Sequence, residues 1–116
     1  MQWTVLFHPD FIDEAHGFPA EAQDEFAALI RVLQQLGPHL KRPRCDTLNG
    51  SKHANMKELR FNAADGVWRV AFAFDPDRQA VLLVGGDKSG VSQKRFYDAL
   101  IRRADKRFDD WLEDLT

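Results

Sequence analysis

Among the cationic side chains in the stretch from residue 55 to residue 88, four that lie on strands or at strand ends are best suited to do chemistry: Lys57, Arg60, Arg69 and Lys88. This stretch reads as three consecutive antiparallel strands, so a sheet would hold the charges in place. Several cations on one sheet face can bind phosphate, and the planar guanidinium of arginine does so with directional hydrogen bonds. The spacing therefore predicts a phosphate-binding surface on this sheet.

Strand alternation limits which of these cations can act together. Lys57 and Arg60 are separated by an odd number of positions, so an undistorted strand points them to opposite faces, and Lys57 is the first to leave out. Arg69 lies in mid-strand among apolar neighbours, where a charge is costly unless it is paired or solvated. Two alternatives stay open for Arg69, namely a salt bridge, for instance to Glu58, and exposure on an open sheet face.

No other pattern in the sequence indicates a metal, a cofactor or an activated nucleophile. The histidines are scattered, and the single cysteine, Cys45, has no CxxC partner, so we expect neither metal nor cofactor. The glycine-rich segment 85–90 lacks the GxxxxGK[ST] pattern of a phosphate-binding loop and is interpreted as the exit of a strand.

The surrounding sequence predicts the elements that hold these residues. Apolar alternation indicates strands, and apolar residues at spacings of three and four indicate helices. Strands are expected near 2–8, 56–62, 67–74 and 80–84, with a short helical turn at 10–15, helices at 19–36 and 92–115, and an irregular connection at 37–54. The fold class is α+β, in the order β-α-α-β-β-β-α, with helices packed on one face of a small antiparallel sheet and one domain over residues 1–116.

Charge is segregated along the chain, although the net charge is only −2. Residues 1–36 carry −5, residues 37–60 carry +4 and residues 80–104 carry +3. Such segregation can make a basic patch on an acidic protein. Further RNA-contacting candidates in the basic segments are Lys41, Arg42, Arg44, Lys52, Lys94 and Arg95. We expect a cytoplasmic protein without a membrane partner, because no apolar run is long enough to span a bilayer and one cysteine suits a reducing compartment.

Three segments in succession resemble a known family. LNGSKHANMKELRF at 48–61, GVWRVAFAF at 66–74 and AVLLVGGDKSG at 80–90, followed by an apolar and basic helix, resemble the RelE/HigB toxins of the RelE/ParE superfamily, with the HigB-like, phage-derived branch the nearest. The resemblance implies a type II toxin that cleaves mRNA on the ribosome without a metal, by attack of the 2′-OH on the adjacent phosphate. It also implies a helix-turn-helix antitoxin, HigA-like, encoded nearby.

The resemblance also implies site residues. Arg60 and Arg69 match the sheet arginines that would clamp the phosphate, and Lys88 matches the basic residue after the last strand. The remaining candidates are Lys57 near the family's strand lysines, His53 and Asp87 for proton transfer, and Tyr97 as the family's late tyrosine. The chain departs from RelE at Glu58 and Met56, where RelE has further bases.

Two other readings remain open. A ParE-like toxin shares the fold and inhibits DNA gyrase without cleaving RNA, although ParE-type members generally lack the set of cations across the sheet. A non-catalytic module would use the sheet or the last helix only to bind a partner protein.

Overall fold

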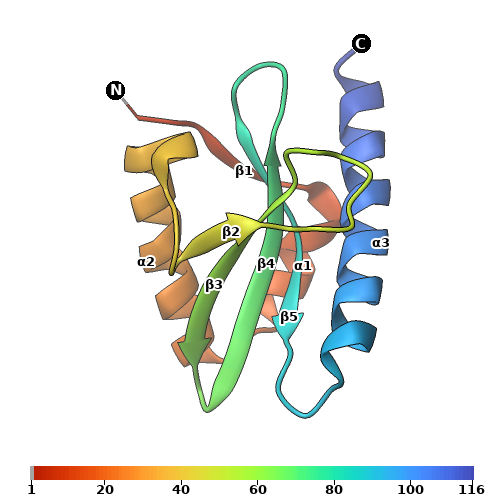
Figure 1. Cartoon of the computed structure of the whole chain (residues 1–116). Coiled ribbons are helices and arrows are strands. Elements are labelled where there is room, and N and C mark those ends of the chain that lie inside the picture. The colour runs from red at the N-terminus through yellow and green to blue at the C-terminus, as the bar shows by residue number, and fades with distance from the viewer. Residues whose placement is uncertain (1) are drawn as a thin grey trace.

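The structure, a computed structural model, describes residues 2–116. Its elements are β1 (Val5–Phe7), α1 (Pro9–His16), α2 (Ala20–Leu36), the short 3-10 helix η1 (Gly37–His39), β2 (Cys45–Thr47), β3 (Lys57–Ala63), β4 (Gly66–Phe74), β5 (Ala80–Asp87) and α3 (Gln93–Asp114). They form a five-stranded sheet in the order β1-β5-β4-β3-β2, between α2 and α3 (Figure 1). The α+β class is confirmed.

The sheet is mixed, which the prediction of an antiparallel sheet missed. β2, β3, β4 and β5 pair antiparallel, but β1 pairs parallel to β5 in the register Val5↔Ala80 to Phe7↔Leu82. β5 therefore lies between β1 and β4. Its side chains from Ala80 to Val84 are buried on both faces, as the continuous apolar run predicts.

The prediction that the helices pack on one face is wrong. α1 and α2 cover one face, where Phe26 and Leu33 pack in the same buried cluster as Phe72 and Leu82. α3 covers the other face, where its apolar stripe packs on a second buried cluster that contains Val81, Leu83, Leu100, Ala104 and Phe108. The central strands are apolar at both odd and even positions, so each face of the sheet needs a helical cover.

The β3–β4 hairpin turns at Ala64 and Asp65, which both have positive φ, 51° and 61°. Gly66 is the first residue of β4, where a Cβ would lie 2.7 Å from the Asp87 carboxylate. The position therefore needs glycine for space beside the neighbouring strand.

Other differences are local. The connection at 37–54 contains η1 and the three-residue strand β2, and β5 continues through Gly85 and Gly86 to Asp87. α3 begins where predicted, because the Ser92 hydroxyl accepts a hydrogen bond from the Arg95 amide at 3.2 Å. Within residues 2–116, the helices are too short or too polar to cross a membrane.

Candidate active site

A polar cluster lies on the α3-facing side of the sheet, formed by Glu58, Arg60, Arg69 and Tyr97, and is called here the Glu58 cluster. β3 carries Glu58 and Arg60, which share a face because they are two residues apart. β4 carries Arg69, the direct cross-strand partner of Arg60. α3 carries Tyr97 in its second turn, above these strands. The cluster therefore joins two neighbouring strands and one helix.

Glu58 is the centre of the hydrogen-bond network. Its Oε1 accepts the Tyr97 hydroxyl at 2.8 Å, and its Oε2 accepts Arg60 Nη1 at 3.1 Å. Arg69 Nε donates to the Tyr97 hydroxyl at 3.2 Å and lies 3.8 Å from Glu58 Oε1, while Arg69 Nη1 donates to the Trp68 carbonyl at 2.8 Å. The tyrosine hydroxyl thus joins a carboxylate acceptor and a guanidinium donor.

Burial divides the cluster into an inner and an outer part. The side chains of Glu58 and Arg69 are 6% and 7% exposed, whereas that of Arg60 is 29% exposed. The expectation that Arg69 faces an open sheet surface is therefore wrong, because α3 covers it. The salt-bridge alternative to Glu58 is the one that the structure bears out. Arg60 remains partly exposed to solvent.

The protonation of Tyr97 follows from its surroundings. Burial and the hydrogen bond to the Glu58 carboxylate raise the pKa of Tyr97 above its ordinary value, and Arg69 opposes this only in part. Tyr97 is therefore a neutral phenol at physiological pH. The cluster as a whole carries two guanidinium groups against one carboxylate, an excess of positive charge that suits a phosphate.

Tyr97 also forms part of the wall of a surface cleft of about 780 Å³ between α3 and the loop before β3. The other lining residues are Asn49, Gly50, Gln93, Lys94, Asp98, Ile101 and Arg102. Lys88 lies beside this cleft, since its Nζ donates to Gln93 Oε1 at 3.4 Å. Tyr97 thus lies in the same cleft as the basic side chains Lys94 and Arg102 of α3, with Lys88 at the end of β5 beside it.

Other predicted site residues lie elsewhere. Lys57 lies on the sheet face that α2 covers, because it pairs with Phe72, whose side chain packs in the cluster on that face. Lys57 and Arg60 therefore point to opposite faces, as strand alternation predicts. Asp87 accepts hydrogen bonds from the amides of Val67 and Ser89 at 2.9 and 2.8 Å and so holds the turn after β5. Burial disfavours its charge, but these bonds and the Ser89 hydroxyl lower the pKa of Asp87. Neither residue belongs to the Glu58 cluster.

His53 and Lys52 attach the loop before β3 to the second half of α3. His53 Nε2 lies 2.9 Å from Asp109 Oδ1, and Lys52 Nζ pairs with the other oxygen of that carboxylate. The hydrogen bond from Lys52 is the main cause that lowers the pKa of Asp109. The Ser51 hydroxyl and the Lys52 amide donate to Asp105. The structure thus gives His53 a docking role.

The predicted RNA-contacting residues are distributed over the surface. Arg42 pairs with Asp46 at 2.7 Å and Lys94 with Asp98 at 2.7 Å, both in (i, i+4) arrangements. Lys41, Arg44 and Arg95 are exposed, and in the described part of the chain none of them forms a salt bridge. Arg44 lines a small cavity together with Arg60. RNA contact by these residues stays a prediction.

Sequence reasoning did not assign Glu58 to the site. It named this residue only as an ion-pair partner and as a departure from the family pattern. The signal was its position two residues before Arg60 on one strand, which places the carboxylate beside the two arginines. The contact with Tyr97 had no sequence signal, because a helical position does not reveal which strand lies beneath it.

A metal site has no donor set in the part of the chain that the structure describes. Among residues 2–116, no group of three or more histidine, cysteine or carboxylate side chains could hold a metal ion.

Comparisons with known proteins identify the family of the chain. The sequence profile of a family described as "Phage derived protein Gp49-like" matches residues 13–109. A candidate toxin of Mycobacterium tuberculosis, HigB3, is 48% identical over 92 residues, which cover 79% of this chain and 78% of that protein. A second candidate toxin from the same organism, HigB2, is 42% identical over 98 residues, which cover 84% of this chain. These residues span about half (48%) of the length of HigB2.

Among solved structures, a double-arginine-to-alanine mutant of the Escherichia coli toxin RelE in the free state has the same fold. The TM-score is 0.63, with 88% of this chain and 96% of that chain covered, at 8% sequence identity. This likeness concerns the fold, whereas the profile and the identities concern the family. The chain belongs to the phage-derived Gp49-like family and to the same family as the candidate toxin HigB3.

Proposed function

We propose that this protein is the toxin of a type II toxin–antitoxin module and an endoribonuclease that cleaves mRNA on the ribosome and so stops translation. The single observation that carries the proposal is the Glu58 cluster, in which a neutral tyrosine links a buried carboxylate and arginine to a surface cleft. Family membership supports the same reaction class.

The cluster supplies the groups that metal-independent RNA cleavage requires. The 2′-oxygen forms a bond to the adjacent phosphorus and the bond from phosphorus to the 5′-oxygen breaks, so one proton must leave the 2′-OH and another must reach the 5′-oxygen. We assign proton removal to Tyr97 and Glu58. The tyrosine oxygen receives the 2′-OH proton as its own proton passes along the 2.8 Å hydrogen bond to the carboxylate.

Charge stabilisation and protonation of the leaving group fall to the cations. Arg60 is exposed enough to contact the phosphate, and its bond to Glu58 Oε2 holds the guanidinium in place. Arg69 is a positioning residue, because it orients the Tyr97 hydroxyl from below. Lys88, which reaches the cleft beside Gln93, is assigned to the leaving 5′-oxygen.

Expression in bacterial cells tests the reaction class. The wild-type chain should arrest growth and leave mRNA with new 5′-hydroxyl ends, mapped by end-specific ligation, and cleavage by purified protein should require added ribosomes. Tyr97→Phe and Arg60→Ala should each lower the cleavage rate by about a hundredfold or more, the usual range for an acid–base or charge-stabilising group.

Arg31→Ala is the matched control, since Arg31 is an exposed arginine on α2, away from the cluster. It should cleave at the wild-type rate. Intact mRNA with DNA damage would instead identify a gyrase inhibitor, and no effect on growth, translation or DNA would leave a binding module. A neighbouring reading frame that encodes a helix-turn-helix protein would support the antitoxin partner.

A further inference from the structure

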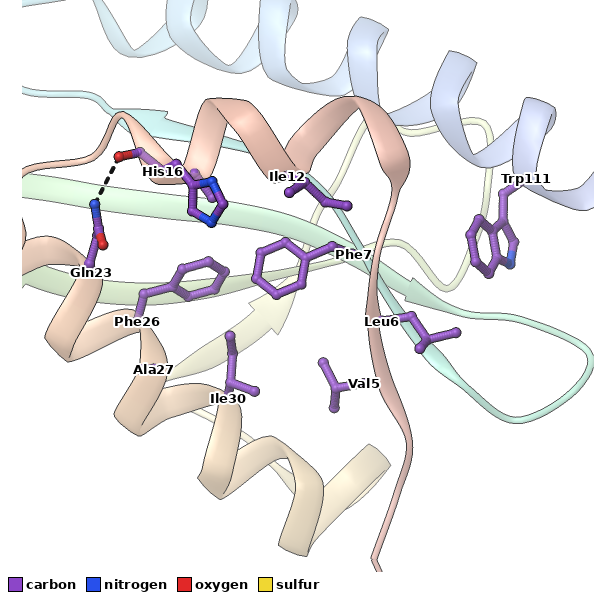
Figure 2. A pocket seen from close by; sticks show the side chains of 11 residues that line it. Val5, Leu6, Phe7, Ile12, His16, Gln23, Phe26, Ala27, Ile30 and Trp111 are labelled. Atoms are coloured by element: carbon purple, nitrogen blue, oxygen red, sulfur yellow. Dashed lines mark hydrogen bonds between the residues drawn. The ribbon is translucent and has the colours of Figure 1, made fainter.

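An apolar groove lies on the sheet edge most distant from the Glu58 cluster. It has a volume of about 560 Å³ and is bounded by β1, α1 and α2, with Trp111 of α3 at one end (Figure 2). At the other end, Gln23 Nε2 donates to the His16 carbonyl at 2.9 Å. Because β1 and β3 are separated by β5 and β4 in the sheet, this groove is not part of the candidate active site.

The groove follows an open strand edge. Consecutive side chains of a strand point to opposite faces, yet Val5, Leu6 and Phe7 all line the groove, so the groove lies along the edge of β1. Hydrogen bonds from Ala80 to the Thr4 carbonyl and from His8 to the Leu82 carbonyl, at 2.9 and 2.8 Å, direct the even-numbered backbone groups to β5. Those of Val5 and Phe7 point outward, where residues 2–116 offer no strand partner.

An acidic cavity adjoins the apolar groove at Trp111, which lines both. This second cavity, of about 480 Å³, has His8 together with Asp10, Asp110 and Asp114 in its wall. Asp110 pairs with Lys106 at 3.2 Å, but in the described part of the chain Asp10 and Asp114 form no salt bridge with lysine or arginine. The combined surface is therefore apolar along β1 and negative beyond its end.

We propose that this surface binds an extended segment of another protein, which adds to the sheet as a strand beside β1, places alternating apolar side chains in the groove and sets a lysine or arginine in the acidic cavity. The unpaired backbone groups of β1 favour an extended segment, since a helix has no free backbone groups to pair with them. The acidic end selects a basic terminus. A partner bound here leaves the Glu58 cluster uncovered.

Short synthetic peptides test the proposal with the purified full chain. One series alternates valine and threonine with a pair of lysines at the N-terminal or C-terminal end, because the strand could add in either direction. A matched series carries glutamates in place of the lysines. We expect one lysine peptide to bind about tenfold tighter than its glutamate counterpart, equivalent to about 1.4 kcal/mol, by fluorescence anisotropy. On binding, the amides of Val5 and Phe7 should become protected from hydrogen exchange.

Two exposed apolar residues make a matched pair of variants. Ile12 lines the groove and is 44% exposed, whereas Val91 is 45% exposed and lies outside the groove. Ile12→Glu should abolish peptide binding, and Val91→Glu should leave it unchanged, with circular dichroism showing that both are folded. Asp114→Lys should reverse the preference toward the glutamate peptide.

Equal binding of both peptide series, binding without protection of Val5 and Phe7, or equal loss in the two glutamate variants would each overturn the proposal. Because the assay measures peptide binding and not RNA cleavage, a failure here leaves the proposed function unaffected.

Discussion

The two faces of the sheet bury their side chains in different ways. The face toward α1 and α2 is closed by aromatic and aliphatic packing, with Phe61 stacked between Phe26 and Trp68 at ring-centroid distances of 5.9 and 6.3 Å. The face toward α3 is apolar near Leu100, Ala104 and Phe108 but polar beneath the start of that helix, where Glu58 and Arg69 are almost fully buried.

The difference indicates where this chain accepts a cost in stability. Burial of charged groups gives little net stabilisation even when they are paired, whereas apolar burial is the main contribution to folding. The α2 face therefore holds the fold, and the polar end of the α3 face is better explained by function. This comparison can be tested by variants on each face.

The largest effect on stability is expected from Phe72→Ala on the α2 face. Phe72 is fully buried in that cluster, and its truncation should lower the free energy of unfolding by about 4 kcal/mol through lost burial and a cavity. Urea denaturation measures this loss. RNA cleavage per folded molecule should not change, and a selective loss of cleavage would mean that the two faces are not separable.

The second-largest loss of stability is expected when one partner of the buried ion pair between Glu58 and Arg69 is replaced. Glu58→Met leaves Arg69 without its carboxylate and should destabilise the fold by about 3 kcal/mol. The double variant Glu58→Met/Arg69→Met should recover most of this stability, because an apolar pair replaces an ion pair at little net cost. The double variant should still fail to cleave RNA. Recovery of activity with stability would show that the pair has only a structural role.

A smaller effect is expected from Tyr97→Phe, which removes one hydroxyl from the network and should cost about 1 kcal/mol. Its pH dependence is the sharper measurement. The pKa of Tyr97 is raised in the folded protein. The contribution of Tyr97 to the free energy of unfolding is therefore fully present below the pKa of the unfolded chain, near 10, and is lost as the pH rises through the pKa of the folded protein. Above about pH 10, the wild type should lose stability more steeply than Tyr97→Phe. Parallel curves would contradict this.

The last prediction concerns the reactivity of a thiol and involves no change in stability. Cys45 belongs to the buried cluster of the α2 face, and burial raises the pKa of its thiol to about 11. Because alkylation requires the thiolate, iodoacetamide at pH 8 should label the folded chain about a hundredfold more slowly than the urea-unfolded chain. Rapid labelling of the folded chain would show that this face opens readily.

The sequence predicted the parts of the fold that depend on local pattern. Alternation identified β3 and β4, the apolar run identified β5, and apolar residues at spacings of three and four identified α3. It could not predict which face each helix covers, because an apolar stripe looks the same on either side of a sheet. β2 was missed because three residues in a connection with two nearby prolines carry too little pattern.

The candidate site was predicted in part. The arginines of β3 and β4 were named from the sequence, and the ion pair to Glu58 was one of the two alternatives left open for Arg69. Tyr97 was named as a residue of the family, but its hydrogen bond to Glu58 spans 39 positions of the chain and depends on how α3 lies on the sheet. His53 and Asp87 were chosen by type, and their partners, Asp109 and the turn after β5, could not be read from the sequence.

The attachment of the loop before β3 to Asp105 and Asp109 has a consequence for the shape of the cleft. Asn49 and Gly50 form one wall of the cleft beside Tyr97, and the residues that follow them are anchored two to three helical turns further along α3. The loop that forms one wall of the cleft is therefore attached at one end to α3, the helix that forms the other wall. The width of the cleft then depends on contacts at Asp105 and Asp109, which lie outside the lining of the cleft itself.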